Sequence, residues 1–318
     1  MSHAPFFPRR TLRAMALAAL LALAACAPRI DLPQYDLPRP DLQAFRERFT
    51  EPALEGNGLA VRASLLYSTP TRANRTDVQL YGEYARPLRM DVRAGIGTML
   101  ALMREDSGGL LAFYPDKSRA YAHSDPVIGA QLLGLPFPFS LRDLAMVISG
   151  HFETLVPEEP DSIHVLPGGG FAFNYNQGPV RLLVLDQYGR PQRMEGQLSK
   201  YFRTQAEREG QPVSGKREWT LKFEAYPEDD GDPVGPAKRL VLLLPKGDSA
   251  TLRVRAVDVR REPWASKSLA LALPPGAHFM SLESRPAPAA ASDVITGGGD
   301  DAEQRHENHD DGTSGSAS

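Results

Sequence analysis

A single cysteine, Cys26, occurs among the 318 residues, so no intramolecular disulfide can form. The chain also lacks the motifs of common catalytic sites: it has no HExxH zinc motif, no GxSxG nucleophile elbow and no glycine-rich phosphate loop. Neither sign of charge is in excess, because the formal net charge is −3, and no basic stripe indicates a nucleic-acid partner. The seven histidines are scattered. We therefore expect no enzymatic activity, no cofactor, no metal site and no nucleic acid.

Long apolar runs are also missing, and the run near the N-terminus is too short to span a bilayer. Basic residues precede the apolar stretch 14–25, which has the length of a signal-peptide core, so residues 1–25 are predicted to be an export signal. The stretch closes on LAAC at positions 23–26, which resembles the lipobox of bacterial lipoproteins. An ordinary secretory signal with an incidental cysteine is the alternative.

The lipobox resemblance implies that Cys26 is lipidated and becomes the first mature residue. Ala27 stands where aspartate retains many lipoproteins in the inner membrane, so the implied location is the outer membrane, with the chain facing the periplasm. Buried acyl chains contribute about 0.8 kcal/mol per CH₂, which is enough for stable anchoring when more than one chain is attached.

Composition divides the remaining chain into three parts. Residues 26–40 are proline-rich and are expected to form a semi-rigid tether behind the lipidated cysteine. Residues 286–318 are rich in Pro, Ala, Gly, Ser and Asp, which predicts a disordered acidic tail. Residues 41–285 are long enough to form one domain with a sizeable core.

Alternation of apolar and polar residues dominates this domain and predicts mainly β structure after a short helix at 41–49. Turn clusters containing Gly, Pro, Asn or Asp separate the segments. Strands are expected at residues 59–68, 78–84, 88–92, 98–104, 110–114 and 118–123, and again at 163–166, 170–175, 180–186, 192–202, 216–226, 239–245, 251–261 and 269–273.

The alternation breaks between these two groups of strands, where two short helices are expected at 126–134 and 141–149. Ser140 is a suitable N-cap for the second helix, and Gly150 a suitable stop. The connection between them, LLGLPFPF at 132–139, is unusually apolar. It is either a buried linker that plugs the core or a mobile lid.

So many antiparallel strands in one chain must curl, because large open sheets are uncommon and free edges invite association. We expect a mainly β fold with a few α-helices: a strongly curved antiparallel sheet, forming an incomplete, half-open β-barrel of about 11 strands, with short helices covering the concave face. That face either keeps an apolar cavity or is filled as a core. Alternation alone places the following residues on it: Val61, Leu65, Leu80, Tyr84, Met90, Leu100, Leu102, Phe113, Leu182, Val184, Leu221, Phe223, Leu242 and Val254.

One predicted hairpin holds an isoleucine, Ile96, between two glycines, although turns usually favour polar residues. The hairpin and the order of elements resemble LolA/LolB-like outer-membrane lipoproteins, the lipoprotein receptor and carrier superfamily. In LolB-like proteins an "R-L-x-hydrophobic" strand leads to an exposed apolar residue followed by Gly and Ser or Thr. Here LRMDV at 88–92 leads to IGT at 96–98. The resemblance implies that Ile96 contacts cargo or membrane; alternatively, it packs onto a neighbouring strand.

The resemblance also implies a function. It predicts an outer-membrane-anchored, periplasm-facing lipoprotein that binds acyl chains of lipoproteins or other lipids in an apolar concave cavity. The expected process is lipoprotein localisation or lipid transfer, with a periplasmic carrier protein as a further partner. The alternative is a non-catalytic structural or assembly adaptor that has the same fold, a filled core and an outer-membrane tether.

Overall fold

The computed structural model describes residues 40–51, 56–95, 97–198, 218–229, 232–233, 235–244 and 247–283. The expected signal, Cys26, nearly all of the tether and the acidic tail lie outside these residues. Within the described part, no helix combines the length and the apolar character needed to cross a membrane.

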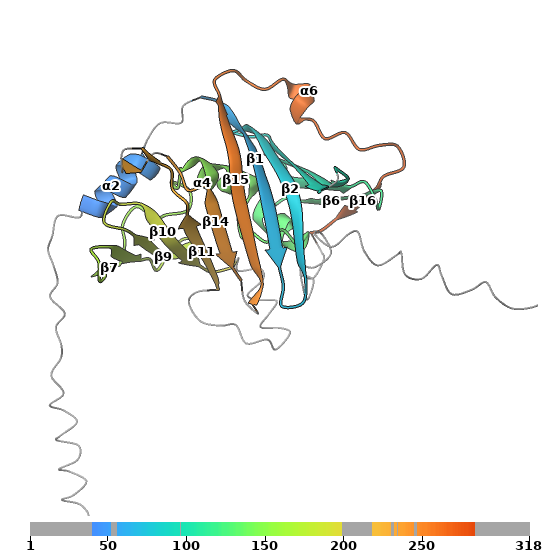
Figure 1. The fold of residues 1–318 in the computed structure, drawn as a ribbon. Helices are drawn as coiled ribbons and strands as arrows, with labels where there is room; N and C mark the ends of the chain where they lie inside the picture. The colour runs from blue at the N-terminus through green and yellow to red at the C-terminus, as the bar shows by residue number, and fades with distance from the viewer. Residues whose placement is uncertain are drawn as a thin grey trace, which may run out of the picture. The chain divides into compact units, whose positions relative to one another are not determined.

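One sheet of fourteen strands forms the body, in the order β16-β6-β5-β4-β3-β2-β1-β15-β14-β11-β10-β9-β8-β7 (Figure 1). A separate pair, β12 and β13, stands outside it. The strands are β1 (Gly58–Ser68), β2 (Ala73–Glu83), β3 (Leu88–Ala94), β4 (Met99–Asp106), β5 (Gly109–Tyr114), β6 (Arg119–His123), β7 (Ser162–Val165), β8 (Phe171–Asn174), β9 (Val180–Leu185), β10 (Pro191–Gly196), β11 (Trp219–Glu224), β12 (Glu228–Asp229), β13 (Asp232–Pro233), β14 (Arg239–Leu243), β15 (Ser249–Arg260) and β16 (His278–Ser281).

The sheet is curved and not closed, since β7 and β16 end the order without pairing to each other. Register shifts between Arg62 and Ala63 on β1 and between Val92 and Arg93 on β3 interrupt the ladders near the middle of the sheet. Such bulges increase the local twist and bend the strands. The expected half-open barrel is confirmed.

The end of the described chain differs from the expected pattern. Residues 269–273, expected as a strand, do not form one: Leu269 ends the short helix α6 (Ser266–Leu269), and residues 270–273 are irregular. The edge strand is β16 instead, and it pairs parallel to β6, whereas all other pairs in the sheet are antiparallel. The segment between β15 and β16 leads the chain from the middle of the sheet to this edge. In this segment, the carbonyl oxygens of Ala270 and Leu269 accept from Arg89 and Arg104 at 2.7 and 3.0 Å.

Helices cover the concave face of the sheet. α2 (Pro40–Phe49) packs near β9, α3 (Pro126–Leu132) on β5 and β6, and α4 (Leu141–Ser149) on β3. In Figure 1, α3 and α4, in green, lie behind the central strands β15 and β1. The expected caps of α4 are confirmed: Ser140 Oγ accepts from the Asp143 amide at 3.0 Å, and Gly150 ends the helix with φ 83°.

A buried carboxylate fixes the start of α4 on the sheet. Glu105 on β4 is fully buried and accepts from the amides of Leu141 at 2.6 Å and Arg142 at 3.3 Å, and from Arg86 Nε at 2.8 Å. The amides at a helix N-terminus favour a negative charge. Burial nevertheless raises the pKa of Glu105 above its ordinary value of 4.5, and the Arg86 guanidinium and the two amides oppose this shift.

The raised pKa of Glu105 predicts how stability depends on pH. Because folding raises this pKa, the folded chain holds a proton that the unfolded chain releases, so stability is lost as pH rises from 4.5 through the raised pKa. Relative to Glu105→Gln, the wild type should therefore lose free energy of unfolding over that window. Urea unfolding from about pH 4 to about pH 8 measures this difference, and parallel curves for the two proteins would contradict it.

Two further variants separate the effect of the Glu105 charge from that of its hydrogen bonds. Glu105→Ala leaves Arg86 and two helix amides without their acceptor and should lower the free energy of unfolding by about 3–5 kcal/mol. Glu51→Gln, at an exposed position, should change neither stability nor its pH dependence.

Candidate functional site

A small apolar cavity lies between the concave face of the sheet and the segment that connects α3 to α4. Its free volume is about 20 Å³, room for about one water molecule. Ser140 is the polar exception among its lining residues, and its hydroxyl is occupied, since it donates to Asp143 Oδ2 at 2.8 Å. The lining residues are Leu65, Val78, Met90, Val92, Leu135, Phe137, Phe139, Ser140, Leu141, Leu144 and Leu252.

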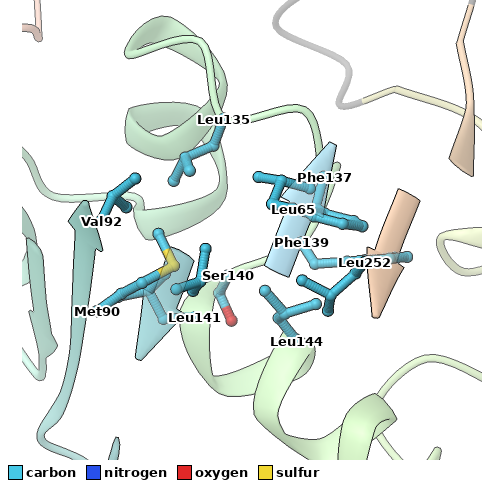
Figure 2. Close-up of a pocket in the computed structure, with 11 residues that line it drawn as sticks. Leu65, Met90, Val92, Leu135, Phe137, Phe139, Ser140, Leu141, Leu144 and Leu252 are labelled. Carbon is cyan, nitrogen blue, oxygen red and sulfur yellow. The ribbon is translucent and has the colours of Figure 1, made fainter. Parts of the chain in front are cut away.

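The lining comes from two sides that face each other. Figure 2 shows Met90 and Val92 of β3, Leu65 of β1 and Leu252 of β15 converging on the side chains of the connection and of α4. The strand residues share one face because side chains alternate along a strand: Leu65 and Leu252 are paired directly, as are Val78 and Val92. The cavity therefore lies over β1, β2, β3 and β15, near the middle of the sheet.

The connection fills most of the space above these strands. We call residues 135–139 the plug. Phe137 and Phe139 are 4% and 3% exposed, and Phe139 packs edge-on against the buried Trp219 of β11 at a ring distance of 5.4 Å. Pro136 and Pro138 have no backbone N–H group to donate, which disfavours a helix or a strand in the plug. Of the two interpretations of this segment, the structure shows the one in which it plugs the core.

The plug and α4 are held by different forces. α4 has polar anchors at both ends: Glu105 accepts from its first amides, Arg142 Nε donates to the Tyr84 carbonyl at 2.8 Å, and Ser149 Oγ lies 3.3 Å from the Tyr84 hydroxyl. The aromatic side chains of the plug are held by apolar contacts, which are not directional. An apolar ligand could replace those contacts, whereas it could not replace the hydrogen bonds of α4.

The structure divides the residues expected on the concave face into three groups. Leu65 and Met90 line the cavity. Most others lie in the main core on the same side of the sheet, packed against further core residues rather than against free space: Val61, Leu80, Tyr84, Leu221, Phe223, Leu242 and Val254. Leu100 is partly buried and packs against this core.

The third group lies outside this core. Leu182 and Val184 form a separate cluster with Ala172, and Leu102 and Phe113 pair with each other on the face opposite Met103 and Ala112. The reason is the period of two: in runs such as VRLLVL and GLLAFY both faces are apolar, so alternation does not say which face is inward. These four side chains point away from the cavity.

The sequence pattern did not identify most of the residues that line the cavity. Strand register identifies three of them. Leu252 lies opposite Leu65, Val92 lies two residues from Met90, and Val78 lies opposite Val92. The helix-side residues had a signal in the sequence, the apolar run at 132–139, but that run does not reveal which strands it covers.

Two expected sites lie outside the described residues. Ile96 is one of them, although its neighbours Gly95 and Gly97 are described and exposed. Cys26, the expected lipidation site, is the other. Over the described ranges, no group of three or more His, Cys, Asp or Glu side chains is placed to hold a metal ion.

Comparison with known proteins finds likeness in structure rather than in sequence. No protein-family model matches the chain, and a search of curated proteins finds no significant match. Among solved structures, a LolA superfamily protein from Nitrosomonas europaea is 13% identical, with a TM-score of 0.49 over 72% of this chain and 97% of that one. A domain named for outer-membrane lipoprotein sorting from Vibrio parahaemolyticus is 14% identical, with a TM-score of 0.44 over 72% and 94%.

A third solved structure, a DUF1329 family protein from Desulfovibrio piger, is 8% identical, with a TM-score of 0.44 over 68% of this chain and 90% of that one. The first of these names is that of the LolA superfamily, which the sequence resembles, and the second refers to lipoprotein sorting. At these identities the likeness concerns the fold and does not extend to a ligand. The described fold is similar to these structures at low identity and with TM-scores below 0.5.

Proposed function

We propose that this protein binds the acyl chain of a lipid or lipoprotein on its concave face, in lipoprotein localisation or lipid transfer at the outer membrane. The observation that carries the proposal is the apolar cavity under the plug, whose lining offers no free polar group. Binding there needs apolar area and no catalytic group.

A bound chain must displace the plug, because a cavity of about 20 Å³ cannot hold one. Moving Phe137 and Phe139 into water costs roughly 3–6 kcal/mol, at about 1.5–3 kcal/mol for each side chain. Each buried CH₂ of a ligand returns about 0.8 kcal/mol. A chain of roughly eight or more methylene groups therefore offsets the larger of these costs.

The segment that moves is the plug rather than α4. α4 keeps its hydrogen bonds to Glu105 and Tyr84, so its residues Leu141 and Leu144 remain as one wall of the cavity. The plug leaves behind Leu65, Met90 and Leu252, which a chain would then cover.

The anchoring part of the proposal rests on the lipobox-like LAAC sequence. Lipidation at Cys26 would attach the body to the outer membrane through the proline-rich tether, facing the periplasm, where a carrier protein could deliver cargo.

A second candidate function follows from the small size of the cavity. Because the concave face is nearly filled in this structure, the chain could serve as a non-catalytic adaptor whose core takes no ligand. The two functions differ in one measurable property, the uptake of an acyl chain.

Ligand uptake should depend on chain length. We expect methyl palmitate to displace a fluorescent fatty-acid methyl ester probe from the purified full chain carrying Cys26→Ser, methyl laurate to do so weakly, and methyl octanoate not at all. The reason is the threshold of about eight methylene groups set by the plug. If the chain takes up neither the probe nor any ester, the carrier proposal fails and the adaptor is favoured.

The plug should limit affinity. Phe137→Ala removes one aromatic side chain that must be exposed on opening, so methyl palmitate should bind on the order of tenfold more tightly, although the empty protein is less stable. Phe173→Ala is the matched control, because Phe173 is equally buried in the core but does not line the cavity. Similar affinity changes in both variants would show that general loosening, rather than the plug, controls uptake.

Anchoring is tested separately. In the native bacterium, Cys26→Ser should abolish the lipid-dependent mass increase of the mature chain and release it from the outer-membrane fraction. Ala27→Asp leaves the cysteine intact and should keep the lipid, while moving the chain toward the inner membrane. Membrane association that persists in a Cys26→Ser chain from which the signal has been removed would contradict the lipid anchor.

A further inference from the structure

The apolar interior ends at one hydroxyl on β2. Along the inward face of this strand, Leu80, Val78 and Thr76 are 1%, 5% and 2% exposed, and the next inward residue, Asn74, is partly exposed. Thr76 therefore marks the boundary between the dry interior and the end of the sheet that carries the β1–β2 and β3–β4 hairpins. Any ligand that enters the cavity from this end must pass it.

The Thr76 hydroxyl has no hydrogen-bond partner among the described residues, although it is completely buried. A buried hydroxyl without a partner is costly, and buried polar groups in native proteins are nearly always paired. A strand position in an otherwise apolar row could hold valine with nearly the same shape. The unpaired Thr76 hydroxyl is therefore explained if a bound ligand supplies its hydrogen-bond acceptor.

The position of Thr76 connects it to the cavity. It pairs directly with Leu65 of β1, and Val78 is two residues away on the same face; both of these residues line the cavity. Its partner on the other side is Ala94 of β3, whose side chain is a single methyl group. Thr76 thus lies beside two lining residues of the cavity and opposite a small neighbour on β3.

The nearby polar group on β1 is already occupied. Tyr67, two residues beyond Leu65 on the inward face, donates its hydroxyl to Asp248 Oδ2 at 3.1 Å. Burial, together with this hydrogen bond and the charge of Asp248, raises the pKa of Tyr67 to about 12, so the phenol stays protonated. The Tyr67 hydroxyl already has an acceptor, so the Thr76 hydroxyl is the one of these two that can donate to a ligand.

We propose that Thr76 donates a hydrogen bond to the carbonyl oxygen of the bound acyl group and thereby selects acyl esters and amides over plain hydrocarbons. This proposal rests on the proposed function and specifies its ligand. The carbonyl is the first polar atom that follows an acyl tail, so a tail in the cavity places it at the boundary. The Asp248 carboxylate on this side repels a free fatty-acid carboxylate, which favours the neutral ester or amide.

The experiment compares two probes of similar length, methyl palmitate and hexadecane, both delivered from cyclodextrin to the full chain carrying Cys26→Ser. In Thr76→Val, affinity for methyl palmitate should fall about fivefold, while affinity for hexadecane stays unchanged, because only the ester loses a hydrogen bond. Thr76→Ser keeps a hydroxyl and should retain the preference for the ester.

A matched control removes a comparable hydroxyl elsewhere. Thr50, after the end of α2, also has a buried hydroxyl without a partner among the described residues, but it does not neighbour the cavity. Thr50→Val should leave the affinity for both probes unchanged. The thermal stability of empty Thr76→Val should equal or exceed that of the wild type, because no bond of the empty protein is lost.

Several results would overturn the assignment, and they differ from failure of the proposed function. Unchanged ester affinity in Thr76→Val, with both probes bound, rejects the role of Thr76 alone. An equal loss for both probes assigns the effect to shape and likewise rejects it. If the wild type binds neither probe, the acyl-binding function and this inference fail together.

Discussion

An open sheet with one apolar face has to cover that face, and this constraint organises the described part of the chain. The curvature gives the sheet an inside, and two bulges near its middle increase the bend. Helices α3 and α4 and the plug then cover the concave side. The strands alone would leave Leu65, Met90 and Leu252 in water, so the covering segment and the sheet stabilise each other.

The cover combines two kinds of interaction. Hydrogen bonds from the first amides of α4 to the buried Glu105 fix this helix, although burial raises the pKa of that carboxyl. Apolar contacts hold the aromatic side chains of the plug, and such contacts can be exchanged for those of a ligand. A fixed wall beside an exchangeable plug is a suitable arrangement for uptake of an apolar chain.

Much of this fold could be predicted from the sequence, because alternation and capping are local properties. The strands, the Ser140 cap and the Gly150 stop all depend on nearby residues. Leu182 and Val184 could not be assigned to a face, since their strand is apolar on both sides. The parallel strand β16 depends on a partner far away in the sequence, and alternation carries no information about it.

The candidate site was harder to predict than the fold. Its lining combines strand residues with the plug, and which strands the plug covers is decided by the tertiary structure. Thr76 gave no signal at all, because threonine is common in strands, and only the packing shows that its hydroxyl has no partner.

The pairing of β1 with β15 has a consequence for the order in which the chain folds. Gly58 pairs with Arg260, and this ladder joins the half of the sheet made by β2–β6 to the half made by β7–β11 and β14. Each half consists of hairpins between neighbours in the sequence, so each can begin to form early. The junction of the two halves cannot be completed until residue 260 has been synthesised. The continuous concave face is therefore a late product of folding.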